Sequence, residues 1–366
     1  MKLLVYGPKI VWWEDAVGKI RLRRFQEDPR ERGPTNRLKR FTRTSSMLLL
    51  LVFLTACSGS QSVLDAAGTG ARETLSVWWL MFWLGTVVFV VVLALLWIAV
   101  SRTTDSKETT SKSTRTRMVV LGGIVMPVII IAIVFIFSTR GLVAIGDLRG
   151  DDSVTIDIAA HQFWWEVSYP DEGFVTANEI HIPVGESVDI RLTSNDVIHS
   201  FWVPSLHGKI DVMPGHTTSI TLKAEEAGTF RGQCAQFCGA QHANMAFLVI
   251  AQEYDEYRAW AAHQAEPAEA VPESDAIVRG QDIYMSSMCV YCHTIRGTAS
   301  SGTLGPDLTH LNSRETIGAG ILENNRGNLA GWIVDPQEIK PGNHMPGITL
   351  TGEELDDLLN YLESLD

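Results

Sequence analysis

Two long uncharged stretches constrain the fold of this chain more than any other feature. Residues 75–100 and 118–138 contain no charged side chain and are mostly apolar, and about 20 apolar residues are enough to cross a bilayer. Pro127 lies inside the second stretch, where a membrane helix tolerates it. A buried helix of a soluble protein is the alternative for either stretch, and we favour two transmembrane helices.

The segment between them, residues 101–117, is basic. Its charged side chains are Arg102, Lys107, Lys112, Arg115 and Arg117 against Asp105 and Glu108. By the positive-inside rule this loop is cytoplasmic. Both ends of the hairpin then face outward, and everything after about residue 140 is extracytoplasmic.

The N-terminal region has the pattern of a lipoprotein-type signal peptide. Residues 47–56 are an apolar run too short to span a membrane, and basic side chains precede them. The run ends at Leu54-Thr55-Ala56-Cys57, so we expect cleavage after residue 56 and acylation of Cys57. Residues 1–36 carry no motif, and we assign them no function.

Charge is distributed unevenly along the chain. Residues 150–366 hold 10 Lys and Arg against 32 Asp and Glu, which leaves a net charge of −22. An acidic outer region suits a basic protein as electron donor, because complementary fields speed encounter. Solvation of an exposed surface explains the charge equally well.

Short alternating segments follow Gly150 and predict an antiparallel β-sandwich over residues 150–262. The expected strands are Ser153–Ala159, Gln162–Tyr169, Glu179–Pro183, Ser187–Thr193, Thr217–Lys223, Gly228–Gly232 and Ala246–Ala251. The run GQCAQFCGAQHANM falls between the last two and is therefore expected to be a loop. Its ligand-type residues would also share one face of a helix, but Gly239 and the flanking strands argue against one.

That run concentrates soft metal ligands. Cys234, Cys238, His242 and Met245 lie within twelve residues, and His199 stands upstream in DVIHSFWVP. Sulfur and imidazole donors select copper over hard cations. A blue-copper site needs one cysteine, whereas two can bridge a pair of ions, so the pattern indicates a dinuclear copper centre that carries electrons. A structural zinc site is the alternative.

A second motif, Cys289-Val290-Tyr291-Cys292-His293, has the C-x-x-C-H spacing of covalent haem c attachment. Residues 263–275 are rich in Ala, Glu and Pro and predict a linker. Residues 276–366 resemble a small class I cytochrome c, in which an amphipathic segment before the haem motif packs against a C-terminal helix. The resemblance implies His293 as proximal and Met345 as distal iron ligand, with Pro306 orienting His293. His344 is the rival to Met345.

The membrane pair and the copper motifs together resemble subunit II of the cytochrome c oxidases over residues 57 to about 262. HQFWWEVSY, DVIHSFWVP, PSLHGKIDVMPG and the cysteine loop occur in that family's order. The resemblance implies a mixed-valence CuA centre, with both cysteines bridging and one histidine on each copper. Met245 and the backbone carbonyl of Gln236 would be the weaker ligands. Electrons would enter at an aromatic surface formed by Phe163, Trp164 and Trp165; packing of these side chains in the sandwich core is the alternative.

Three departures from the family pattern limit what is carried over. Gln236 stands where the family often has a Glu that helps to hold magnesium at the subunit boundary, which weakens the case for that ion. Phe163 replaces a common Trp at the point where electrons enter. Val120 replaces an acidic residue of the second membrane helix, so we assign this subunit no role in proton uptake.

The combination resembles the subunit II of caa-type oxidases. It predicts a multidomain membrane protein: a two-helix transmembrane hairpin, an all-β cupredoxin sandwich and an all-α class I cytochrome c domain. Electrons would pass from a donor, such as a cytochrome c or a bc-type complex, through haem c and CuA to subunit I of a proton-translocating oxidase. Oxygen reduction would occur on subunit I, because this chain lacks the histidines for it.

The resemblance also implies the chain's surroundings. We expect subunit I, subunit III and membrane lipid as partners, no nucleic acid, and a bacterial inner membrane with both cofactor domains on the periplasmic side. The alternative is a membrane-tethered haem and copper carrier that serves another reductase. Nitrous oxide reductase also uses CuA, but its large catalytic domain is missing, and the haem motif argues against copper storage.

Overall fold

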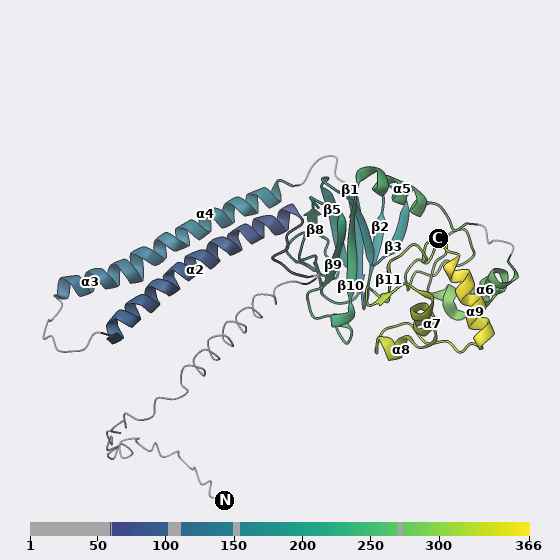
Figure 1. Ribbon diagram of the computed structural model, residues 1–366. Coiled ribbons are helices and arrows are strands. Elements are labelled where there is room, and N and C mark those ends of the chain that lie inside the picture. Colours follow the sequence, from purple (N-terminus) through teal and green to yellow (C-terminus); the bar gives the residue numbers. More distant parts are fainter. Residues whose placement is uncertain (1–58, 60, 102–110, 149–153, 270–273) are drawn as a thin grey trace, which may run out of the picture. The chain divides into compact units, whose positions relative to one another are not determined.

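A computed structural model describes residues 59, 61–101, 111–148, 154–269 and 274–366 (Figure 1). The expected signal peptide, the lipidation site Cys57 and most of the expected cytoplasmic loop lie outside these residues. The predictions made for them therefore stay predictions.

Two long apolar helical segments begin the described part of the chain. Helix α2 spans Thr69–Ser101, and the second segment runs through α3 (Lys112–Val120), a π-helical turn η1 (Leu121–Val125) and α4 (Met126–Gly146). Both are long and apolar enough to cross a membrane by length and composition. They extend beyond the expected ranges because polar residues at their ends continue the helix.

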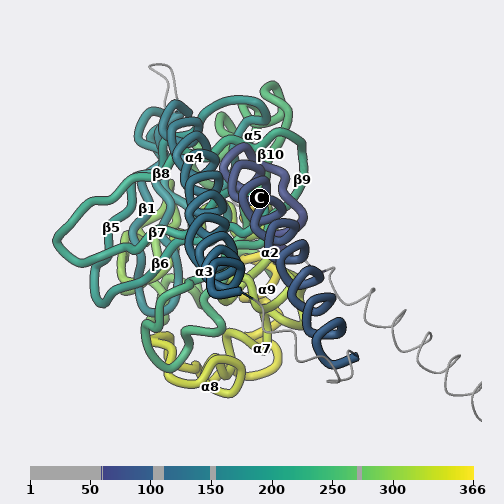
Figure 2. Tube along the Cα trace, turned by 90° about the vertical axis from the view of Figure 1, so that its left-hand side faces the viewer, coloured from purple at the N-terminus to yellow at the C-terminus, as the bar shows by residue number. Residues whose placement is uncertain are grey.

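Helices α2 and α4 lie side by side (Figures 1 and 2). Close to their contact, a Cβ at Gly141 would stand 3.6 Å from the Glu73 carboxylate. The π turn precedes Pro127, whose ring would clash with the carbonyl four residues earlier in a regular α-helix. A widened turn relieves such a clash.

Two five-stranded sheets form the sandwich predicted for the next region. One has the strand order β3-β2-β1-β5-β8 and the other β4-β10-β9-β6-β7. The strands are β1 (Val154–His161), β2 (Trp164–Tyr169), β3 (Phe174–Ala177), β4 (Glu179–Pro183), β5 (Val188–Ser194), β6 (His199–Trp202), β7 (Ile210–Val212), β8 (Thr218–Leu222), β9 (Gly228–Cys234) and β10 (Ala246–Gln252).

The sandwich corrects the sequence prediction in two respects. The sheets are mixed, because β1 pairs with β5 and β4 pairs with β10 in parallel. Strands β3, β6 and β7 were not predicted, since runs of three or four residues are too short to show an alternating pattern. The seven predicted strands are all present, with ends shifted by two residues or fewer.

Alternation along β1 and β2 builds the core between the sheets. Every second residue of both strands is buried, as a two-residue period requires. Trp165 is fully buried, and its ring lies 5.8 Å from Phe201 and 5.3 Å from Phe247. Burial of side chains of this size contributes roughly 2–3 kcal/mol each.

The C-terminal region is mainly helical. Helix α5 (Tyr254–Ala265) enters the expected linker, whose residues 270–273 are not described, and α6 (Asp275–Ser286) follows. A short antiparallel pair, β11 with β12, was not expected in an all-α domain. The remaining elements are η3 (Met288–Tyr291), β11 (Thr316–Ile317), β12 (Leu322–Glu323), α7 (Arg326–Val334), α8 (Pro336–Ile339) and α9 (Gly352–Glu363).

Helices α6 and α9 pack together, as the sequence predicted. Gly280 allows the closest approach, because a Cβ there would stand 2.0 Å from the carbonyl oxygen of Asp357. Arg279 donates two hydrogen bonds to the Asp357 carboxylate, at 2.7 and 2.8 Å. Helix α9 starts with a capping box between Thr351 and Glu354, which satisfies amide groups at its N-terminus.

Candidate copper and haem sites

The cysteine loop begins where β9 ends. Cys234 is the last residue of β9, Cys238 lies in the following turn, and His242 opens the 3-10 turn η2 (His242–Asn244). All of residues 234–245 are described, and their helical structure is limited to that turn. The loop prediction is therefore confirmed over its helical alternative.

The two cysteines meet, and each has its own imidazole. Their Sγ atoms are 3.8 Å apart. Cys234 Sγ lies 3.8 Å from Nδ1 of His199, which comes from the start of β6 in the same sheet. Cys238 Sγ lies 3.7 Å from Nδ1 of His242. Four expected copper ligands thus converge, three of them with donor atoms within 4.8 Å of one another.

Two further candidate ligand atoms lie beside the cysteines. Met245 Sδ lies 3.8 Å from Cys238 Sγ, and the Gln236 carbonyl oxygen lies 3.2 Å from Cys234 Sγ. The cysteines, His199 and Met245 are buried, whereas the Gln236 side chain is exposed. Buried sulfur and imidazole donors suit copper or zinc and not magnesium or calcium. The residues present therefore fit a soft metal centre.

The two thiols differ in acidity because they contact each other. Their mutual hydrogen bond lowers the pKa of Cys234 and raises the pKa of Cys238. Cys234 is therefore the more acidic thiol of the pair. Because metal ligation by cysteine needs thiolates, binding of metal would release the protons that the thiols carry.

Asp196 orients His199, a role that the sequence analysis missed. Its Oδ1 lies 2.7 Å from His199 Nε2, so the carboxylate binds the ring nitrogen that faces away from Cys234. Burial opposes protonation of His199, but the bonds to Cys234 and Asp196 raise its pKa. A carboxylate behind a ligating histidine fixes its tautomer and orientation. The spacing Asp-x-x-His was the signal that could have revealed this pair.

The haem motif lies at the edge of a large cavity. Cys289 belongs to η3, and Cys292 and His293 follow directly. His293 Nδ1 donates to the carbonyl oxygen of Pro306, at 2.7 Å, the contact implied by the class I cytochrome resemblance. Burial lowers the pKa of His293, which favours the neutral imidazole that ligates iron.

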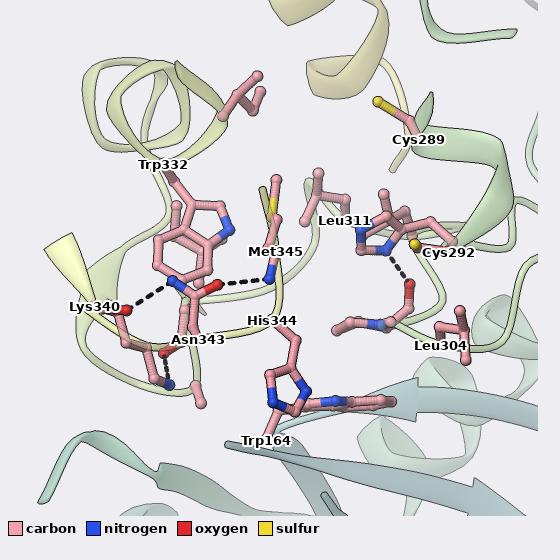
Figure 3. Close-up of a pocket in the computed structure, with 18 of the residues that line it drawn as sticks. Trp164, Cys289, Cys292, Leu304, Leu311, Trp332, Lys340, Asn343, His344 and Met345 are labelled. Atoms are coloured by element: carbon pink, nitrogen blue, oxygen red, sulfur yellow. Dashed lines mark hydrogen bonds between the residues drawn. The ribbon is translucent and has the colours of Figure 1, made fainter. Parts of the chain in front are cut away.

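The cavity has a volume of about 610 Å³ and brings the expected haem residues together. Cys289, Cys292, His293 and Met345 all line it, among mostly apolar side chains. Figure 3 shows Met345 pointing into the cavity beside Trp332, whereas His344 lies next to Trp164. Asn343 and Gln337 hold the backbone of Met345 through hydrogen bonds of 2.7 and 2.9 Å.

A buried cation at the cavity wall also suits a haem. The Arg314 Nε is buried without a hydrogen-bond partner in the described structure, and Arg314 lines the cavity. An unpaired buried donor is costly, and a haem carries carboxylates that such a donor would bind. Two thiols, an oriented imidazole, a thioether and this guanidinium therefore fit a c-type haem.

Comparison with known proteins agrees with both sites. Residues 173–252 match the family described as cytochrome C oxidase subunit II, periplasmic domain, and residues 277–366 match cytochrome c. Cytochrome c oxidase subunit 2 of Alkalihalophilus pseudofirmus is 36% identical over 338 residues, covering 89% of this chain and 98% of that relative. The chain belongs to the cytochrome c oxidase subunit II family. It carries a cytochrome c domain as well.

Other members are similar over shorter stretches. Cytochrome c oxidase subunit 2 of Bacillus sp. (strain PS3) is 34% identical over 66% of this chain and 72% of the relative. The solved periplasmic domain of subunit II of cytochrome oxidase (CoxB) of Bradyrhizobium japonicum is 30% identical, with a TM-score of 0.31 over 32% of this chain and 96% of that domain. The family assignment rests on the sequence relatives.

In this member of the family, the three aromatic residues expected to form one surface are separated. Trp165 points into the sandwich core, with its ring 6.0 Å from that of His199, so its assignment to a surface is wrong. The reason is strand alternation, since Trp164 and Trp165 face opposite sides of β2. Phe163 and Trp164 instead line the haem cavity.

The haem cavity of this oxidase subunit is therefore walled by two domains. The copper domain contributes His161, Gln162, Phe163, Trp164, Asn178 and Asp196. Glu179 accepts a hydrogen bond of 2.8 Å from the amide of Thr316, and Arg231 donates one of 2.8 Å to the carbonyl of Gly320. These contacts pair charged groups of the sandwich with backbone of the cytochrome domain, which the sequence analysis did not foresee.

Proposed function

We propose that this chain is the subunit through which electrons enter an aerobic cytochrome c oxidase. One observation carries the proposal: two cysteine sulfurs 3.8 Å apart, each beside its own imidazole, in a chain that also holds a C-x-x-C-H cavity. Family membership makes the chain a component of a haem-copper oxidase complex together with subunit I. A membrane-tethered carrier for another reductase is the alternative.

The copper site is assigned to the converging donors. Cys234 and Cys238 would bridge two coppers, with His199 and His242 on one each, and with Met245 and the Gln236 carbonyl as weaker ligands. The geometry supports this because each imidazole lies beside a different sulfur. Burial of the sulfurs keeps water and larger oxidants away from them.

The haem site is assigned to the cavity. Cys289 and Cys292 would attach the porphyrin covalently, with His293 as proximal and Met345 as distal iron ligand. Pro306 supports the assignment by holding the His293 ring. When bound, haem c and the CuA centre each supply a site that takes up and releases one electron.

The anchoring of the chain is inferred from its helices. We infer that α2 and the α3-η1-α4 segment cross the inner membrane as a hairpin, because their apolar side chains are largely exposed. The copper and haem domains would then face the periplasm. Acylation of Cys57 would add a lipid anchor.

The partners follow from the family and from charge. Besides subunit I, we propose subunit III, membrane lipid and an electron donor such as a cytochrome c or a bc-type complex. The net charge of −22 over residues 150–366 suits a basic donor and repels nucleic acid. We assign no magnesium, since Gln236 offers only a neutral amide.

Metal analysis of the full chain, purified in detergent without subunit I, tests the proposal. Two coppers per haem iron, with one unpaired electron shared between the coppers in the EPR spectrum, are expected. A mononuclear copper signal, or zinc in its place, would remove the bridging role of the cysteines and favour the carrier. Reduction of both centres by a reduced c-type cytochrome would then be measured by absorbance.

A further inference from the structure

Lys340 is a buried cation at the boundary between the copper and haem domains. It follows α8 and is only 2% exposed, which is rare for a lysine unless its ammonium is paired. Its Nζ donates to the carbonyl oxygens of Phe163 and Gly318, both at 2.9 Å. Burial lowers its pKa to about 7. Among the described residues, no carboxylate forms an ion pair with Lys340.

The segment that starts at Lys340 ends at the expected distal haem ligand. Asn343 Nδ2 donates to the Lys340 carbonyl at 2.7 Å, and Asn343 Oδ1 accepts from the Met345 amide at 2.7 Å (Figure 3). Gln241, the neighbour of His242, donates to the carbonyl of Pro341 at 2.5 Å. Residues 340–345 are therefore tied to each other and to the copper loop.

Phe163, whose carbonyl oxygen accepts from Lys340, lies close to both ligand segments. A Cβ at Gly239, the residue after Cys238, would lie 3.1 Å from two atoms of the Phe163 ring, so ring and loop are in close contact. The Phe163 ring centroid also lies 6.4 Å from that of His344, the neighbour of Met345. A displacement of Phe163 would alter both contacts.

We propose that Lys340 is a positioning residue that holds the Met345 segment against Phe163 and so sets the path of electrons between the domains. The inference rests on the proposed function, in which both centres occupy this chain. In the step concerned, one electron leaves the reduced haem domain and reduces the copper domain, and no bond or proton needs to move. Lys340 acts only through the geometry of Phe163 and Met345.

The test uses the full chain with both centres bound and compares two variants. Lys340→Met keeps the length of the side chain but removes its N–H donors. Arg231→Met is the matched control, because Arg231 also donates to a carbonyl across the domain boundary, that of Gly320, but on another segment. A ruthenium tris-bipyridine dye photoreduces the haem, and absorbance follows transfer to copper.

We expect Lys340→Met to slow electron transfer about tenfold. Loss of these hydrogen bonds lowers the population of the ordered Met345 segment by a factor of this order. Haem content and the absorbance band that reports methionine ligation should not change, whereas amide exchange at Met345 should quicken. Arg231→Met should change the transfer rate less than Lys340→Met does. If Lys340→Met takes up no haem, Lys340→Gln, which keeps N–H donors on a shorter side chain, is judged by the same criteria.

Three results would overturn the inference while leaving the proposed function standing. They are an unchanged transfer rate in the lysine variant, loss of the methionine band in that variant, and equal slowing in the arginine control. A wild-type chain that loads both metals but transfers no electron would instead overturn the proposed function and the inference with it.

Discussion

The side-chain copper ligands of this chain lie 3.7 to 3.8 Å from the nearest cysteine sulfur, whereas the haem ligands line an open cavity of about 610 Å³. In the copper site the ligand atoms already lie close together, and most of them come from one loop. The second is a space between helices, closed on one side by another domain. A small ion needs only donors that already meet, but a haem needs room. The copper site should therefore depend on single side chains, and the haem site on packing.

Loss of one bridging sulfur is the largest expected effect. Cys238→Ser should abolish the dinuclear centre, since a hydroxyl is a poor ligand for copper, while the haem domain keeps its haem. Copper-to-iron ratio and EPR measure the outcome, and the exposed Ala240→Ser in the same loop is the control. If Cys238→Ser also lost haem, the two sites would not be independent.

Overpacking of the haem domain should destabilise that domain and leave the copper site intact. Gly280→Ala would place a methyl group 2.0 Å from the Asp357 carbonyl oxygen and push α6 from α9, at a cost of ~3 kcal/mol. The midpoint temperature of thermal unfolding, monitored by haem absorbance, should fall, and the copper EPR signal should stay unchanged. Gly327→Ala is the matched control, because its nearest neighbour atom would be 3.6 Å away. Equal shifts in the two variants would contradict the packing argument.

The copper domain should also lose stability in acid through a residue outside its metal site. Burial lowers the pKa of His181 to about 4, and its ring stacks on Trp260 at 3.8 Å. Between pH 6.5 and 4 the unfolded chain binds a proton that the folded chain does not. The contribution of the neutral His181 side chain to the free energy of unfolding, ~3 kcal/mol, is therefore complete above pH 6.5. It is lost as the pH falls towards 4.

Urea unfolding at a series of pH values measures the slope of the free energy of unfolding against pH. Copper binding also depends on pH, so the informative quantity is the difference between the wild type and His181→Leu. The variant should lose part of the slope in this window. Identical slopes would show that His181 does not titrate on unfolding.

The smallest effect is expected at the partner of a ligand. Asp196→Asn keeps the shape of the contact with His199 but removes the charge that raises the histidine's pKa. Copper affinity should fall about tenfold, as is typical when such a partner is lost. Competition with a copper chelator measures it, with the exposed Asp211→Asn as control. An unchanged affinity would mean that Asp196 does not tune the ligand.

Much of the fold was predictable because its signals are local. The uncharged stretches, the alternating strands and the amphipathic segment before the haem motif each reflect one element's surroundings. The parallel pairing of β1 with β5 was not predictable, since it depends on which strands the crossovers bring together. Strand β6 was missed although it positions His199.

The sites divide in the same way. Spacing predicted the cysteine loop and the C-x-x-C-H motif, ligand type added His199, and family resemblance added Pro306. Trp165 was misplaced because one position along a strand reverses the side on which a residue lies. Asp196 lay close to a predicted ligand and could have been found, but Arg314 and Lys340 gave no local signal.

By itself, the sequence determined which atoms are available to bind metal, because ligand type and short spacings are written along the chain. Only the tertiary structure decided that Phe163 and Trp164 close the haem cavity and that Lys340 joins the two domains. Those contacts link residues far apart in the chain. Their free energies depend on burial, which exists only once both domains have folded against each other.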